Sequence, residues 1–284
     1  MVKLIDLTFE TVFYGIVGIL LCTSLGINLS LTQVIKSIFS LFFGNYWFIT
    51  SYCLLYIVSP MLNEVINSIP ESLSTKITII LGIFTTVYKT IYANAPICDF
   101  LFFVFVYFLV NELEKEETNK ALLRYSKRGM IITSLCLISV NIIVVIIGDI
   151  LNSQVVLNNS VYLMHRGSIF VLIDAVFVFY YFANKAPFEN TLINMLASTS
   201  LGVYLLHQGL PFYFWQHFLD IDIPGQLLSC VYLVICVFVI FSISCVFDLL
   251  RQKAFELSLN KLINKKLKQV LSKIDGYINE QRLI

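Results

Sequence analysis

Long apolar stretches without Asp, Glu, Lys or Arg dominate the chain and indicate its fold class. A membrane helix needs roughly 20 apolar residues to cross the hydrocarbon core of a bilayer. Four stretches reach that length, and they lie between Glu10 and Lys36, Lys36 and Glu64, Arg128 and Asp149, and Asp222 and Asp248. Each of these stretches predicts one membrane-spanning helix.

Four further segments predict a span although a charged or kinking residue interrupts each of them. These segments are residues 76–92 with Lys89, 97–113 with Asp99, 167–184 with Asp174, and 190–219 with Gly202, Gly209 and Pro211. Because Pro and Gly favour helix kinks, we expect the last segment to bend. The whole pattern predicts an all-α, polytopic membrane helix bundle of about eight transmembrane helices.

Beyond residue 250 the pattern becomes amphipathic. Apolar residues recur every three to five positions, and most lysines fall on other faces of the expected helix. We therefore expect a transmembrane domain at residues 1–250 and a basic, cytoplasmic amphipathic tail helix at residues 251–284. Such a tail is suited to an anionic lipid surface, or equally to packing as a solvated helix on the membrane domain or on a partner.

The composition agrees with a membrane protein and excludes other classes. The 284 residues are 58% hydrophobic and only 13% charged, whereas a soluble domain carries about 25% charged residues. Disordered, coiled-coil, collagen-like and disulfide-scaffold proteins each need low hydrophobicity or a strict repeat. The seven cysteines contain no CxxC pair, so we expect them to pack in the apolar core.

The distribution of positive charge predicts the orientation. Short cytoplasmic loops of membrane proteins are enriched in Lys and Arg. With both termini in the cytoplasm, 16 of the 19 Lys and Arg face inward, and only Lys36, Lys89 and Arg166 face outward. We expect a multi-pass protein of the cytoplasmic (inner) membrane, with a first helix that is not a cleaved signal peptide.

Polar groups inside apolar spans are candidates for function, because the bilayer makes them costly. Asp174 lies well inside its span, so it either binds a ligand or pairs with a neighbouring polar group. Asp149, His165 and Arg166 fall in one outer loop, where they form either a vestibule for an anionic or sugar substrate or an ordinary polar loop. Lys89 and Asp99 flank a short turn, and we expect them to form an ion pair.

His207 is the weak candidate for a catalytic residue. It follows the kinking residue Gly202 and is suited to acid or base chemistry near neutral pH, or else it is a buried histidine bonded to a carbonyl of a neighbouring helix. The three histidines are too widely spaced for a dedicated metal site. The chain has no phosphate-binding loop, dinucleotide-binding glycine pattern or GxSxG motif, and nothing in it indicates nucleic-acid binding.

Two motifs resemble the acyltransferase 3 family of bacterial integral-membrane O-acyltransferases. Residues 45–63 read NYWFITSYCLLYIVSPMLN, similar to the YWFI-x-x-Y and LY-x-x-SP-x-LN signature, and residues 198–207 read STSLGVYLLH, similar to the late GVYLLH helix of the family. Trp47 in the first motif is a candidate substrate-binding residue. The resemblance implies a bundle of about ten membrane helices.

The same resemblance implies an activity. Members transfer an acyl group, usually acetyl from acetyl-CoA, to a sugar hydroxyl of a surface polysaccharide or lipid-linked glycan. The implied partners are therefore the lipid bilayer and a cell-surface glycan or lipid-linked sugar acceptor. Acetyl-CoA enters as the donor, and no bound cofactor is expected.

The chain departs from the family at its catalytic centre. That centre resembles an Arg followed eleven positions later by a His on the first helix, and a second helix with a Phe-rich SG pattern. Here the first arginine is Arg124 and the first histidine is His165, so neither pattern is present in the N-terminal helices. We expect a chain that lacks two helices and is inactive alone. It is a truncated gene product, the product of a mis-started reading frame, or half of a split enzyme whose partner supplies the missing helices.

Two other function classes remain open at the level of sequence. A transporter or flippase would use Asp174, Asp149 and Arg166 along its path and would need no catalytic base. A scaffold for a glycan-assembly complex would need neither a transport path nor a catalytic base. Glycan acetylation distinguishes the acyltransferase from both, and ion-coupled uptake that is lost in Asp174→Asn identifies the transporter.

Overall fold

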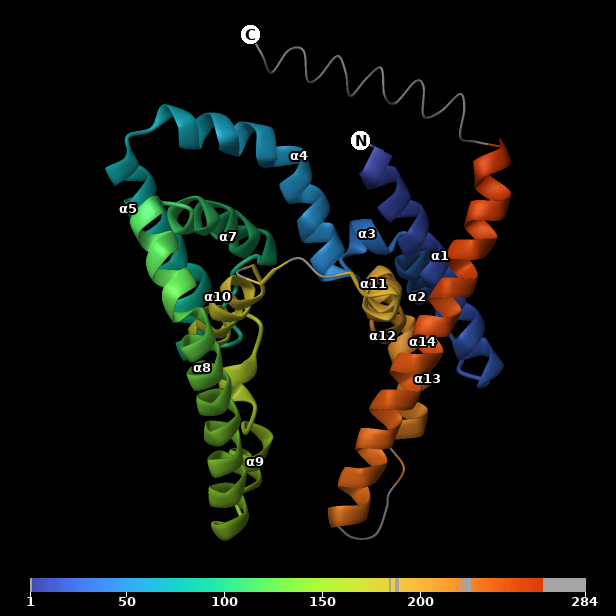
Figure 1. Cartoon of the computed structure of the whole chain (residues 1–284). Helices are drawn as coiled ribbons and strands as arrows, with labels where there is room; N and C mark the ends of the chain where they lie inside the picture. Colours follow the sequence, from blue (N-terminus) through green and yellow to red (C-terminus); the bar gives the residue numbers. More distant parts are fainter. Residues whose placement is uncertain (1, 184, 187–188, 220, 222–225, 263–284) are drawn as a thin grey trace. The chain divides into compact units, whose positions relative to one another are not determined.

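The computed structural model describes residues 2–183, 185–186, 189–219, 221 and 226–262, and every regular element in these residues is helical. The elements are α1 (Val2–Ser24), α2 (Leu31–Ile38), α3 (Ser40–Phe43), α4 (Trp47–Ser68), α5 (Glu71–Gly82), η1 (Ile83–Val87), α6 (Tyr88–Ile91), α7 (Asp99–Leu113), α8 (Glu116–Ile150), α9 (Gln154–Asn158), η2 (Tyr162–Met164), α10 (Ile169–Ala183), α11 (Thr191–Ser198), α12 (Ser200–His207), α13 (Leu210–Leu219) and α14 (Gln226–Leu262). Figure 1 shows them in chain order. The predicted all-α class is confirmed.

The chain forms two compact units. The first unit contains residues 1–50 and 189–284, and the second contains residues 51–188. In the first unit α1 packs against α2, α12 and α13, and α12 packs against α14 (Figure 1). In the second unit α8 packs against α10, and α5 packs against α7.

Within the described residues, five helical segments are long and apolar enough to cross a bilayer. They are Lys3–Ser24, Trp47–Ser68, Thr118–Ile150, Gln154–Ala183 and Val231–Ala254. On α8 the side chains of Ile132, Leu135 and Ile143 are each more than half exposed, as expected for a helix that faces lipid rather than water. The chain is a multi-pass membrane protein.

The count of eight spans stays a prediction, because three of the predicted spans are short or broken. α7 has 15 residues, so it rises about 22 Å, less than the roughly 30 Å of the hydrocarbon core. The segment 76–92 is divided among α5, the π-helical turn η1 and α6. The segment 190–219 forms the three short helices α11, α12 and α13.

One candidate span lies on each side of Lys36, as the first two stretches predict, at Lys3–Ser24 and at Trp47–Ser68. Lys36 lies inside α2 instead of at the border between two long helices, because a capping box of Ser30 and Gln33 starts a new helix at Leu31. The chain turns before that helix at Gly26, whose φ is +71°. The Ser37 hydroxyl then donates a 3.0 Å hydrogen bond to the Gly15 carbonyl in the middle of α1. A stretch without charges therefore contains a turn as well as a helix.

The expected bend in the segment 190–219 is confirmed, but Gly202 takes no part in it. α12 continues through Gly202, and the chain breaks at Thr199 and at Gln208 and Gly209 instead. A Cβ at Gly202 would lie 2.3 Å from Asp248 Cγ and 2.6 Å from the Tyr14 hydroxyl. Gly202 is therefore required for close helix packing and does not bend the helix.

The expected boundary of the tail at Arg251 falls inside α14, which continues to Leu262. Most of the predicted amphipathic tail, residues 263–284, lies outside the described residues. Its function as a surface helix therefore stays a prediction.

Candidate functional site

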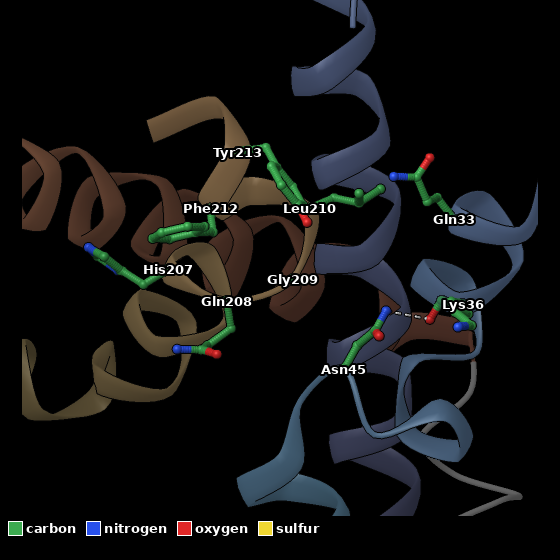
Figure 2. Close-up of a pocket in the computed structure, with 9 residues that line it drawn as sticks. All are labelled: Gln33, Lys36, Asn45, His207, Gln208, Gly209, Leu210, Phe212 and Tyr213. Carbon is green, nitrogen blue, oxygen red and sulfur yellow. Dashed lines mark hydrogen bonds between the residues drawn. The ribbon is translucent and has the colours of Figure 1, made fainter. Parts of the chain in front are cut away.

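A polar pocket of about 440 Å³ lies in the first unit, beside the break between α12 and α13. Figure 2 shows its two walls. One wall comes from α2 and the segment before α4, and the other comes from the α12–α13 junction. Their polar side chains are Gln33, Lys36, Asn45, His207, Gln208 and Tyr213. A helix break inside a membrane protein leaves backbone N–H and C=O groups without helical partners, and these groups must contact protein or water. The junction between α12 and α13 is therefore a natural ligand site.

The local sequence explains why the chain breaks at this point. Gly209 has a φ of +63°, which favours glycine. Pro211 is the second residue of α13, where the missing N–H costs no helical hydrogen bond. A Cβ at Gly18 of α1 would lie 2.6 Å from Pro211 Cδ, so a glycine on α1 lets the start of α13 approach closely.

His207 lies at the end of α12, half-buried in the pocket wall. Its Nδ1 lies 2.6 Å from the Val203 carbonyl oxygen of the same helix. A carbonyl only accepts, so Nδ1 carries the hydrogen in this contact, and in the neutral ring Nε2 is left as the acceptor. The expected alternative of a buried histidine bonded to a neighbouring helix is not observed, because His207 is half-buried and its bond lies within α12. This bond leaves Nε2 free to accept a proton.

The opposite wall carries Lys36 and Asn45. Asn45 Nδ2 donates a 2.8 Å hydrogen bond to the Lys36 carbonyl oxygen, which ties the two residues together. The His207 side chain points away from them in Figure 2. The pocket thus presents a basic group on each wall, without direct contact between the two side chains in this view.

A buried polar cluster connects α1, α12 and α14 in the same unit. The carboxylate of Asp248 is fully buried and accepts hydrogen bonds from the Tyr14 hydroxyl at 2.5 Å and from Arg251 Nε at 2.7 Å. Arg251 also pairs with Glu10 at 2.6 Å. The guanidinium of Arg251 offsets part of the charge of the two carboxylates, which would be costly to bury alone.

Sequence reasoning missed this cluster. Glu10, Asp248 and Arg251 entered the charge pattern only as the ends of predicted spans. Asp248 and Arg251 are three residues apart and therefore share one face of a helix. That spacing, together with a glycine inside α12, was the available signal for a packed polar contact.

The predicted ion pair between Lys89 and Asp99 is confirmed in the second unit, with 3.4 Å between Lys89 Nζ and Asp99 Oδ1. Arg166 joins the pair through Asp99 Oδ2 at 2.8 Å. His165 accepts a hydrogen bond from the Gly167 amide at 3.1 Å. Asp149 lies in the last turn of α8 with an exposed side chain. The structure thus unites Arg166 with the expected ion pair, and a substrate vestibule stays a prediction.

Asp174 and Trp47 each have a structural environment. Asp174 Oδ1 on α10 accepts hydrogen bonds from Thr133 at 2.6 Å and Ser134 at 2.8 Å, both on α8. The structure therefore pairs Asp174 with neighbouring hydroxyls, one of the two predicted alternatives. Trp47 begins α4, half-buried, with its ring 5.9 Å from the ring of Phe48. Substrate binding by either residue stays a prediction.

The described residues contain no group of three His, Cys, Asp or Glu side chains able to hold a metal ion.

Comparison with known proteins identifies one family. A family model described as an acyltransferase domain, that of the acyltransferase 3 family, matches residues 3–248. No curated protein and no solved structure matches the chain. The family match covers both structural units and most of the chain. The chain therefore belongs to the acyltransferase 3 family of membrane proteins.

Proposed function

We propose that the protein is a membrane O-acyltransferase that transfers acetyl from acetyl-CoA to a sugar hydroxyl of a surface polysaccharide or lipid-linked glycan. The observation that carries the proposal is the family match over residues 3–248. The polar pocket at the α12–α13 junction supports it, since its volume of about 440 Å³ lies in the usual range of ligand sites.

The reaction needs a base. A neutral hydroxyl is a poor nucleophile, so its proton must leave as the oxygen attacks the thioester carbonyl. The new ester bond forms, the bond between carbonyl carbon and sulfur breaks, and the sulfur leaves as coenzyme A thiol after it takes up a proton. One group can accept the first proton and donate it to the leaving sulfur.

His207 is the residue we assign to this role. Its Nδ1 is held by the Val203 carbonyl at 2.6 Å, which fixes the ring and leaves Nε2 as the acceptor. The sugar hydroxyl would donate to Nε2 as it attacks. The buried neighbour Trp215 supports the same junction, because its Nε1 donates a 2.9 Å hydrogen bond to the Leu206 carbonyl.

A second way to complete the site is a partner chain. The Arg and His pair of the family does not occur at its spacing in the N-terminal helices of this sequence. If a partner supplies those two groups, His207 orients substrate instead of taking the proton. Replacement of His207 separates these two arrangements, because only the first loses most of its rate.

Deletion of the gene in its host, followed by complementation, tests the proposed function. The O-acetyl content of the surface glycan is measured by proton NMR before and after mild alkaline treatment, which removes esters. We expect loss of ester-linked acetyl on deletion and its return on complementation. Unchanged O-acetyl content in the deletion strain would contradict the proposal.

A further inference from the structure

The pocket beside the α12–α13 junction is lined by basic side chains and by no acidic ones. Its nine lining residues include one Lys and one His, and none of them is Asp or Glu. The pocket therefore favours an anion over a neutral or positive group. Lys36 is exposed at the pocket wall, so we expect its attraction for an anion to weaken as salt screens it.

Several basic side chains that lie between helices in the described residues form ion pairs, and Lys36 forms none. Lys89 pairs with Asp99, Lys115 with Glu112, and Arg251 with Glu10. Lys36 has no ion pair within the described ranges, although its side chain lines the pocket. Its positive charge is therefore available to a bound ligand.

The neighbouring amides are arranged to add hydrogen bonds. Gln33 Oε1 accepts from the Ser30 amide at 2.8 Å and from the Ser30 hydroxyl at 2.9 Å. This capping contact leaves the Gln33 NH₂ as a donor, and Figure 2 shows that nitrogen on the side of Leu210. Asn45 uses Nδ2 on the Lys36 carbonyl, so its Oδ1 remains as an acceptor for a ligand hydroxyl.

The opposite wall adds backbone donors. Leu210, Phe212 and Tyr213 in the first turn of α13 line the pocket, and Gly209 before them has no side chain to cap the helix. Pro211 has no N–H, so only the amides of the other residues can donate. The first amides of a helix have no partner within the helix. A lysine, amide donors and helix amides together form a set of donors suited to phosphate oxygens.

We propose that this pocket binds a phosphate group of a substrate of the acyl transfer, with Lys36 as its charge partner. The inference rests on the proposed function, because that reaction supplies two phosphate-bearing substrates. One source is the phosphates of the coenzyme A donor, and the other is the phosphate that links a glycan to its lipid. Both present the same oxyanion to Lys36.

Binding to the purified full chain in phosphatidylcholine nanodiscs tests the proposal without any turnover. The two probes are coenzyme A and geranylgeranyl pyrophosphate, each titrated by microscale thermophoresis. We expect Lys36→Gln to weaken the binding of at least one probe by about 10-fold or more, the usual loss for a hydrogen bond to a charged group. Lys76→Gln, which removes an exposed lysine of α5 in the second unit, is the matched control and should change neither affinity.

The probes distinguish the two sources. If the affinity for coenzyme A depends on Lys36, the bound phosphate belongs to the donor. If the affinity for the pyrophosphate depends on Lys36, the bound phosphate belongs to the lipid-linked acceptor. Lys36→Arg keeps the charge and should retain at least part of the affinity. If Lys36→Gln fails to fold, the wild-type affinity must still fall as salt screens the contact.

Binding of both probes that is independent of Lys36 and of salt, or no binding of either, overturns the proposal. The proposed function can fail separately. Binding that depends on Lys36 in a protein that does not acetylate glycan would leave the phosphate site standing and reject the acyltransferase assignment.

Discussion

The Tyr14 hydroxyl donates a 2.5 Å hydrogen bond to the fully buried carboxylate of Asp248, although the two residues are 234 positions apart in the chain. Arg251 holds the same carboxylate and also pairs with Glu10 of α1. These contacts connect α1 to α14 within the first unit.

We expect Arg251→Gln to destabilise the first unit by about 3–5 kcal/mol, because it leaves two largely buried carboxylates without a charge partner. Tyr14→Phe should cost less, about 1–3 kcal/mol, because it removes one hydrogen bond from Asp248. The free energy of unfolding is measured by SDS titration in mixed micelles. Arg124→Gln, at an exposed arginine of α8, is the control, and an equal loss there would contradict the role of the cluster.

Gly202→Ala should be strongly destabilising. The added Cβ would lie 2.3 Å from Asp248 Cγ and 2.6 Å from the Tyr14 hydroxyl, so α12 must move away from α1 and α14. Ser200→Ala on the same helix removes an exposed hydroxyl and should change the free energy of unfolding by no more than about 0.5 kcal/mol. A Gly202→Ala protein as stable as Ser200→Ala would show that the helices are not packed this closely.

The fold class of this protein was predictable, and most of the site was not. Apolar length predicted a helical membrane protein, and a local turn predicted the pair of Lys89 and Asp99. Charge-free length could not reveal the turn at Gly26 or the short helix α2, because a turn inside an apolar stretch contains no charge. The partnership of Glu10 with Arg251 depends on long-range packing, which a single sequence does not show.

Variants of Asp174 distinguish a structural role of this residue from a role in transport. Asp174→Asn keeps an oxygen that accepts from Thr133 and Ser134, so we expect stability near that of the wild type. Asp174→Ala leaves two hydroxyls without that acceptor and should cost about 1–3 kcal/mol. Uptake assays on the Asn variant provide the contrast, because loss of ion-coupled uptake with stability intact would favour a transporter.

We expect the contribution of Lys115 to stability to be independent of pH over the neutral range. Its hydrogen bonds to Glu112 and Glu71 raise the pKa of Lys115 above its ordinary value of 10.5. A raised folded-state pKa means that the contribution is fully present below the unfolded pKa and is lost as the pH rises through the folded pKa. The difference in unfolding temperature between wild type and Lys115→Gln should therefore stay constant from about pH 6 to about pH 9. A difference that disappears within that range would contradict the assignment.

His207→Asn should lower the rate of acetyl transfer by about 10²- to 10⁴-fold, the range for loss of a general base, with little change in the unfolding temperature. His217→Asn, at an exposed histidine of α13, is the matched control and should keep the wild-type rate. A His207→Asn protein that transfers acetyl at the wild-type rate would assign the base to another residue or to a partner chain.

The most direct measurement follows the acetyl group itself. Membrane vesicles from cells that produce the chain are given acetyl-CoA labelled with ¹³C in the acetyl group, and their glycan fraction is examined by NMR for labelled esters. The account predicts labelled O-acetyl groups on the glycan, absent from vesicles of a deletion strain and strongly reduced with His207→Asn. Equal labelling of the glycan in vesicles with and without the chain would contradict it.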